Sequence, residues 1–289
     1  LHDALPHRNI GLAGRFTYGY DSRYFVEGNF GYNGSERFAK NERFGFFPSI
    51  GLGWIVSNES FMKDVEPINN LALRVSYGSN GNQSIDPYST LAKVGTNKYI
   101  FAGDPSYSIT QGISSFALND LGWEKTTGFN AGVDFSLLKN RLSGTVDAYF
   151  THTTDLLFSL SLPSVSGKTS MLSNLGKIRN KGVEIGLHSV NIESKDFRWT
   201  SDFAFSLNRN KVVTIYGEDN DGDGKEDDLI SSGYFIGKTL GTIYNYKVNG
   251  MWQQEDVDNG TIMEGMRPGD YKLEDVDGDG KISSDKDRQ

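Results

Sequence analysis

The sequence has no cysteine, no long apolar run and no excess of basic residues. With 0 cysteines in 289 residues, disulfides, thiol chemistry and Cys-ligated zinc or iron–sulfur sites are excluded. Because no run approaches the ~18 apolar residues of a membrane helix, and mean hydropathy is −0.46, no transmembrane helix is predicted. A net charge of −8 argues against nucleic-acid binding, which needs a basic surface. The first residues lack the features of an export signal, and we take the chain to be a piece of a longer protein.

Glycine and aromatic residues are abundant instead. The chain contains 34 Gly, 18 Phe and 14 Tyr. A membrane β-barrel turns only every second strand residue toward lipid, so its hydropathy is low even though it spans a bilayer. Its strands also carry aromatic residues where they cross the two membrane–water interfaces. The composition is therefore compatible with a membrane barrel.

The clearest strand pattern lies between Trp123 and Phe158. Its first arm places Phe129, Ala131, Val133 and Phe135 on one face and Asn130, Gly132, Asp134 and Ser136 on the other. Its second arm alternates in the same way from Leu142 to Phe150, after a tight turn at 139–141. Period-two alternation predicts an antiparallel hairpin with one apolar and one polar face. Each arm approaches the ~9–11 residues that a tilted strand needs to cross a bilayer, whereas strands of soluble sheets typically have ~5–6.

The same alternation recurs along most of the chain. It is found at residues 12–20, 23–33, 45–56, 70–78, 178–190 and 196–209. The connections alternate in length: those at 21–22, 57–69, 139–141 and 191–195 are shorter, those at 79–122 and 159–177 are long, and 34–44 is intermediate. Up-and-down membrane barrels have short turns on one side and long loops on the other.

We therefore predict an all-β fold, an antiparallel up-and-down transmembrane β-barrel. Residues 1–210 are predicted to supply about eight strands, with long loops at 79–122 and 159–177. Residues 211–289 start on the long-loop side and are predicted to be an extracellular loop region, with a small hairpin around 242–248. Open sheet edges are not tolerated in lipid, so the strands either close as a small barrel or belong to a larger one.

Several segments resemble one known family. GRFTYGYDSRYFVEGNFGYNGSERFA, FGFFPSIGLGWIVSNESFM, LALRVSYGSNGNQ, IRNKGVEIGL and the central hairpin resemble the barrel half of SusC/RagA-like TonB-dependent transporters. RPGDYKLEDVDGDGKISSDKDR is similar to the segment that precedes that family's last strands. The resemblance implies a partial barrel of a protein with about 22 strands in the bacterial outer membrane.

The resemblance also implies a function and partners. It implies an importer of oligosaccharide or peptide cargo, which is not an enzyme and requires no cofactor. It further implies a SusD-like surface lipoprotein as a partner, and TonB, which acts through a plug region that has no counterpart in these residues. Outer-membrane lipid is the remaining expected partner.

Two Asp/Gly-rich turns carry candidate calcium ligands. Asp275, Asp277, Asp279 and Gly280 match positions 1, 3, 5 and 6 of a calcium loop, in which alternate carboxylates converge on one cation. Ser283 stands at position 9, while position 12 is Lys286 instead of a carboxylate, flanked by Asp285 and Asp287. The earlier turn repeats the spacing with Asp219, Asp221, Asp223 and Gly224, followed by Asp227. The alternative is that both are solvated acidic turns.

Two other classes of protein remain as alternatives. One is a calcium-stabilised secreted β-sandwich that binds glycans, and the other is a β-rich glycosidase. Acidic residues on the polar strand faces are more simply explained as lining of a barrel lumen. The four histidines show no metal or triad spacing, so no catalytic residue is predicted.

The face assignment predicts opposite effects at adjacent positions. Val133→Arg places a charge in hydrocarbon and is expected to cost about 2–4 kcal/mol near the bilayer midplane, whereas Asp134→Arg is expected to be tolerated.

Overall fold

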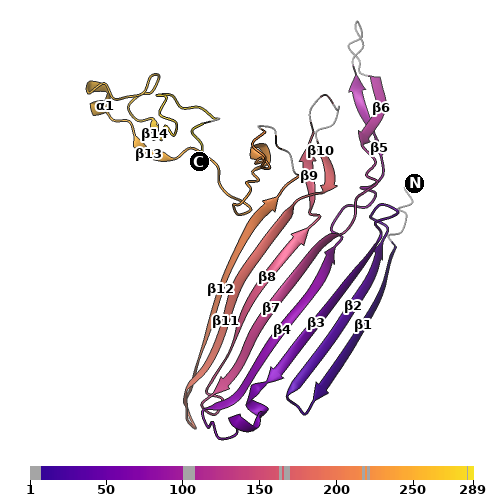
Figure 1. Ribbon diagram of the computed structural model, residues 1–289. Helices are drawn as coiled ribbons and strands as arrows, with labels where there is room; N and C mark the ends of the chain where they lie inside the picture. The colour runs from indigo at the N-terminus through magenta and orange to yellow at the C-terminus, as the bar shows by residue number, and fades with distance from the viewer. Residues whose placement is uncertain are drawn as a thin grey trace. The chain divides into compact units, whose positions relative to one another are not determined.

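One antiparallel sheet of eight strands dominates the computed structural model (Figure 1). The structure describes residues 8–99, 108–162, 165, 170–216, 219, 222–284 and 286–289. The strands of the sheet, in spatial order, are β1 (Asn9–Tyr20), β2 (Tyr24–Ser35), β3 (Phe44–Ile55), β4 (Ile68–Asn82), β7 (Glu124–Leu137), β8 (Leu142–Thr154), β11 (Lys177–Glu193) and β12 (Arg198–Thr214). All eight predicted strands are present, and their up-and-down order confirms the predicted fold class.

The strand registers place the long connections at one end of the sheet. Asn82 pairs with Glu124, and Thr154 pairs with both Lys125 and Lys177, so the links 83–123 and 155–176 leave the same end, as does 36–43. The turns 21–23, 138–141 and 194–197 lie at the opposite end with the link 56–67. We call these the long-loop end and the short-turn end. The two longest connections therefore share one end, although the link 56–67 at the short-turn end is longer than 36–43 at the long-loop end.

The long loops contain two hairpins that the sequence did not indicate. β5 (Lys93–Tyr99) pairs with β6 (Ser108–Ser115), and β9 (Leu157–Ser161) pairs with β10 (Ser170–Asn174). In the first hairpin the paired residues Val94 and Ile113 are 69% and 56% exposed. Because the apolar side chains described in this hairpin are exposed and pack on no core, no sustained apolar period is required of its sequence.

Each strand of the main sheet has an apolar and a polar face. One row of consecutive cross-strand partners consists of Leu73, Val133, Val146, Ile185 and Phe205. The adjacent row consists of Ala72, Asp134, Thr145, Gly186 and Ala204, and it points to the other side. We call the side of the first row the outer face and the side of the second row the inner face.

The outer face is not covered by the described part of the chain. Phe129, Phe203 and Phe205 are 45%, 56% and 46% exposed. An apolar surface that extends over eight strands is typical of strands that face lipid and is rare on a soluble monomer. None of the described helices is long and apolar enough to cross a bilayer.

The apolar core lies at the long-loop end. Its members are Phe38, Phe47, Ile85, Leu118, Leu121 and Trp123. The Trp123 ring centroid lies 4.9 Å from that of Phe38 and 5.3 Å from that of Phe47, and its Nε1 donates to the Arg43 carbonyl at 3.0 Å. This cluster ties the links 36–43 and 83–123 to the sheet.

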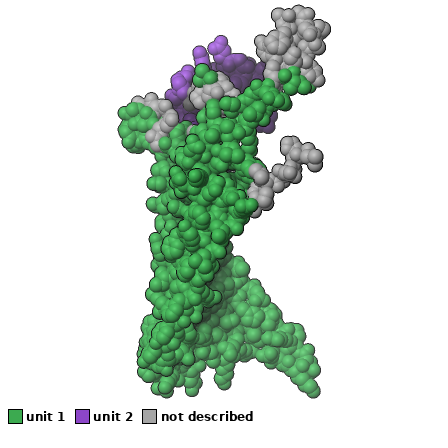
Figure 2. Space-filling model, turned by 90° about the vertical axis from the view of Figure 1, so that its right-hand side faces the viewer, with its two compact units in different colours: residues 1–228, 235–240 green, residues 229–234, 241–289 purple. Residues whose placement is uncertain are grey.

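The chain divides into two compact units, residues 1–228 with 235–240 and residues 229–234 with 241–289 (Figure 2). The second unit contains β13 (Val248–Met251), the short helix α1 (Gln254–Asp258) and β14 (Tyr271–Leu273). The hairpin expected around 242–248 is not formed, because β13 begins at Val248 and pairs with β14. Trp252 organises this unit instead: its ring is buried, with the Lys272 ammonium 4.3 Å from the ring centroid.

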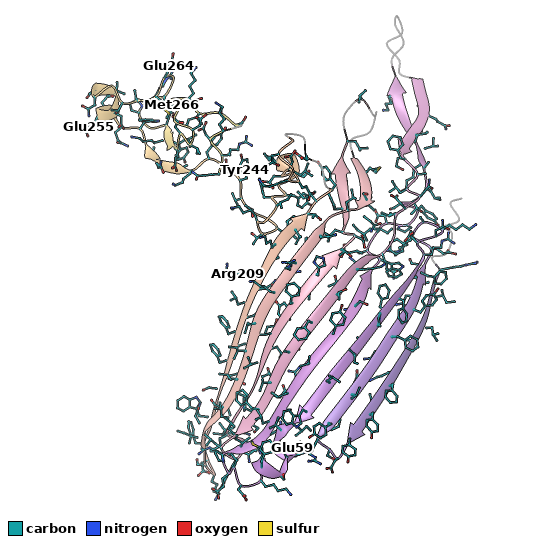
Figure 3. All side chains as sticks on the ribbon, viewed as in Figure 1. Glu59, Arg209, Tyr244, Glu255, Glu264 and Met266 are labelled. Atoms are coloured by element: carbon teal, nitrogen blue, oxygen red, sulfur yellow. The ribbon has the colours of Figure 1, made fainter. Side chains whose placement is uncertain are left out.

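A buried carboxylate holds the short-turn end together. Glu59 lies between the 3-10 turns η1 (Val56–Asn58) and η2 (Ser60–Met62) and is only 7% exposed (Figure 3). It accepts hydrogen bonds from the Tyr24 hydroxyl at 2.5 Å, Arg23 Nη1 at 2.8 Å and Trp54 Nε1 at 3.1 Å. These donors, first among them the Tyr24 hydroxyl, hold the pKa of Glu59 below its usual 4.5.

Replacing Glu59 is expected to make stability less dependent on pH. Because its pKa is lowered on folding, the carboxylate stabilises the folded protein above its unfolded-state pKa of 4.5, and this contribution is lost as the pH falls through the folded-state value. Glu59→Gln should therefore lower Tm at neutral pH, and the difference from the native protein should shrink on acidification. Thermal scans of the barrel in detergent measure this difference.

Glu66 provides the control because it is exposed in the same link. Glu66→Gln should leave Tm unchanged. A Tm difference for Glu59→Gln that stays constant on acidification would contradict the assigned role of the carboxylate.

Candidate functional site

A polar hollow of about 440 Å³ lies on the inner face. It crosses β2, β3, β4, β7 and β8 and is bordered by two cross-strand rows. One row is Glu27, Gly51, Ser76, Asn130 and Tyr149, and the next is Asn29, Ser49, Gly78, Gly128 and Thr151. Amides, hydroxyls and a phenol therefore face the hollow, with glycines between them. Such a surface offers hydrogen bonds to a polar solute while carrying little charge.

An ion-pair network lies on the inner face beside this hollow, toward the short-turn end. Arg74 Nε and Nη2 donate to Asp134 at 2.5 and 3.1 Å, and Nη2 also donates to Asp147 at 3.0 Å. The guanidinium lies over Gly132, where an added Cβ would come within 2.9 Å of it and within 2.6 Å of Asp147 Oδ1. A glycine is therefore needed at this crossing. The network links β4, β7 and β8 through side chains as well as through the backbone.

Two further pairs of polar side chains lie on the inner face. Arg15 lies 2.5 Å from Glu27, which accepts a further hydrogen bond from Asn29 at 2.8 Å. His188 Nδ1 lies 2.7 Å from Asp202. These groups shape a polar wall, and none of them forms a nucleophile–base arrangement with its neighbours. The geometry suits the passage or binding of a solute.

The acidic turn near the C-terminus is only partly assembled as predicted. Among the described residues, Asp275, Asp277 and Asp287 place one carboxylate oxygen each within 4.8 Å of one another. Asp287 is 1% exposed and accepts the backbone N–H of Ser283 at 2.7 Å and of Val276 at 2.9 Å. These bonds, that of Ser283 first, hold the pKa of Asp287 below its usual value, so the carboxylate is ionised at neutral pH.

Asp279 departs from the predicted ligand set, and Lys286 pairs with two of that set's members. The Lys286 ammonium lies 2.9 Å from Asp277 and 3.4 Å from Asp279, and its hydrogen bond lowers the pKa of Asp277. Asp279 is thus turned toward Lys286, and Asp287 takes its place in the acidic group. The Ser283 hydroxyl oxygen is buried without a hydrogen-bond partner among the described residues. Asp285 lies outside the described residues.

The earlier acidic turn is arranged differently. Asp219 accepts the N–H groups of Gly222, Asp223 and Gly224 at 2.7, 3.1 and 2.9 Å, and Asp223 pairs with Lys225 at 3.1 Å. Asp227 is half-buried, and Asp221 lies outside the described residues. Within the described part of the chain, no three carboxylates converge here. A calcium site at this turn stays a prediction.

The chain matches one known protein family along most of its length. The sequence model of the family described as "TonB dependent receptor-like, beta-barrel" matches residues 4–280. The chain is 36% identical to TonB-dependent receptor P3 of Formosa agariphila, over 95% of this chain and 28% of that protein. It is 35% identical to TonB-dependent receptor SusC of Bacteroides thetaiotaomicron, over 95% of this chain and 27% of that protein.

The fold is similar to that of solved transporters. The RagAB peptide importer in its closed-closed state superposes with a TM-score of 0.77 and 26% identity, over 97% of this chain and 30% of that chain. The RagAB peptide transporter gives a TM-score of 0.73 and 28% identity, over 84% of this chain and 26% of that chain. The chain therefore spans less than a third of the proteins it matches.

Because of the Arg74 network, Asp134 is not a suitable inner-face control for the Val133→Arg substitution. Asp134→Arg would place a second guanidinium beside Arg74, so the tolerance expected at Asp134 does not hold. Thr145 pairs with Asp134 across the strands, is exposed on the inner face and provides a better control. Val133→Arg should lower the free energy of unfolding by about 2–4 kcal/mol, and Thr145→Arg should change it by less than about 0.5 kcal/mol.

Urea unfolding of the folded barrel in lipid vesicles measures both variants. Equal losses at the two positions would show that the inner and outer faces are wrongly assigned.

Proposed function

The chain belongs to the TonB-dependent receptor-like β-barrel family, and we propose from this premise that it forms part of the wall of an importer of glycans or peptides. The observation that carries the proposal is the two-faced sheet, with exposed Phe203 and Phe205 on one side and the Asn130 row on the other. The proposed location is the bacterial outer membrane, with lipid against the outer face. The proposed role is positional, so no residue acts as a catalyst.

The side chains that line the inner hollow are suited to a polar cargo. Its side chains include Asn29, Ser76, Asn130 and the Tyr149 phenol, all of which can hydrogen-bond to hydroxyls or amides. An oligosaccharide and a peptide both present such groups. One solved relative is described as a peptide importer, which favours peptides among the candidates.

The partners are proposed on the same premise. We infer a SusD-like surface lipoprotein at the long-loop end, where the Phe38–Trp123 cluster fixes two of the loops to the sheet. TonB would act through a plug region. A calcium-stabilised β-sandwich is not favoured, because the outer face lacks an opposing apolar layer in the described part of the chain.

Adjacent residues of β4 allow a test of transport. Ser76 is exposed toward the hollow, and Val75 is exposed on the outer face. Ser76→Trp should narrow the hollow and reduce cargo uptake several-fold, whereas Val75→Trp should leave uptake unchanged because an aromatic ring is tolerated against lipid. Uptake of a panel of labelled oligosaccharides and peptides is measured in cells that carry the complete transporter variant as their only copy.

The same uptake measurement in a strain without TonB shows how much of the uptake depends on TonB. Outer-membrane levels of both variants should equal that of the native protein. No TonB-dependent uptake of any member of the panel, or equal uptake by the two variants, would contradict the proposal.

We also propose that Asp275, Asp277 and Asp287 bind a calcium ion. Carboxylate oxygens are the preferred ligands of calcium, and the close approach of these three groups supports the proposal. The Lys286 ammonium now neutralises Asp277, so calcium would have to displace it. The ion would then hold together the two ends of the segment 275–287.

Lys286 therefore provides a sharp test. Lys286→Gln should raise calcium affinity and Asp287→Asn should abolish binding, while Lys281→Gln should have no effect because Lys281 forms no ion pair among the described residues. Calorimetric titration, with thermal scans in calcium and in chelator, measures the difference. Absence of binding in both the native protein and Lys286→Gln would leave an ordinary acidic turn.

A further inference from the structure

Six basic side chains gather on the outer face at the long-loop end. They are Lys125 of β7, Lys177, Arg179 and Lys181 of β11, and Arg209 and Lys211 of β12, and all six are exposed. We call them the outer basic patch. The registers place Lys181 directly opposite Arg209 and Arg179 directly opposite Lys211. Figure 3 labels Arg209 on β12.

The patch is unfavourable for the isolated sheet. Like charges directly opposite each other destabilise an antiparallel pair. None of the six takes part in an ion pair with another described residue. The outward-facing positions of β8, β11 and β12 also hold no Asp or Glu, although the whole chain has a net charge of −8. The outward-facing positions of these strands therefore supply no negative charge to pair with the patch.

An apolar hollow adjoins the patch. It has a volume of about 410 Å³ and is lined by Tyr77, Phe129, Phe150, His152 and Arg179, together with Thr127 and Gly128. Arg179 Cζ lies 5.5 Å from the Phe150 ring centroid. Phe129 and Phe150 lie in the same cross-strand row as Lys181 and Arg209. Along this row, the aromatic residues on β7 and β8 are followed directly by the basic residues on β11 and β12.

We propose that the outer basic patch binds the phosphate groups of an anionic lipid in the outer leaflet, with an acyl chain in the hollow lined by Phe129 and Phe150. This inference rests on the proposed function, which places this face in a membrane. Arg and Lys are the side chains that recognise phosphate, and basic clusters at a membrane surface attract anionic lipids. Their long stems keep the charges at the level of the head groups while the strand backbone faces hydrocarbon.

Lipid binding by the complete transporter tests the proposal. The protein is placed in phosphatidylcholine nanodiscs, and diphosphorylated lipid A is added as the probe, with dephosphorylated lipid A as the acyl-matched control. The variant Arg179→Gln/Lys181→Gln/Arg209→Gln removes three charges from the patch. Its affinity for the phosphorylated probe should fall roughly 100-fold, whereas the dephosphorylated lipid should bind both proteins equally weakly.

A matched variant controls for net charge. Lys63→Gln/Lys139→Gln/Lys195→Gln removes three exposed charges at the short-turn end and should bind lipid A as the native protein does. If the patch variant does not fold, Lys181→Gln and Arg209→Gln serve separately, each with a roughly fivefold expected loss. Undiminished lipid A binding by the patch variants would overturn the proposal. Displacement of lipid A by inorganic phosphate would also overturn it, since the site would then bind free anions.

Failure of the lipid site and failure of the proposed function give different results. A native protein that stays monodisperse without detergent and does not enter the bilayer would contradict the proposed function itself. A protein that inserts and imports cargo, but whose patch variants bind lipid A normally, would contradict only the lipid site.

Discussion

Backbone hydrogen bonding between neighbouring strands is the constraint on which this structure depends. In hydrocarbon each strand must satisfy its N–H and C=O groups through its neighbours, because no water is available to do so. Antiparallel pairing over long strands, such as β11 with β12 from Lys177 to Thr214, meets this requirement. The same pairing forces successive side chains to opposite faces. A row such as Leu73, Val133 and Phe205 can therefore face lipid while its neighbours line a polar interior.

Glycines on the inner face leave space for the side chains of neighbouring strands. Gly132 makes room for the Arg74 guanidinium between Asp134 and Asp147. At Gly182 an added Cβ would come within 2.5 Å of the Tyr149 hydroxyl, so the phenol lies across a neighbouring strand. Side chains thus lie along the sheet instead of filling the interior. The polar hollow is bordered by other small positions, Gly51, Gly78 and Gly128.

The strands could be predicted from sequence because alternation is a local property. Val133 and Asp134 reveal two faces without knowledge of any partner, and the turn at 139–141 separates the arms of the hairpin. The loop hairpins escaped prediction because exposed residues such as Val94 do not alternate with a core. The Arg74 network and the outer basic patch depend on register, which brings together residues such as Arg74 and Asp147 that are distant in sequence. At the acidic turn, spacing identified Asp275, Asp277 and Asp287 among the candidate ligands, but it could not show that Asp279 pairs with Lys286.

The most direct test of the two-faced sheet is a spin-label scan of β7 in lipid vesicles. Because these 289 residues contain no cysteine, single cysteines introduced at each position from 128 to 135 meet no background labelling from this part of the protein. The collision rates with oxygen, which concentrates in lipid, and with a water-soluble nickel complex are compared at each position. Oxygen accessibility is expected to be higher at Phe129, Ala131, Val133 and Phe135, and nickel accessibility is expected to be higher at the positions between them. Uniform accessibility along the strand, or the opposite phase, would contradict the assignment of the two faces.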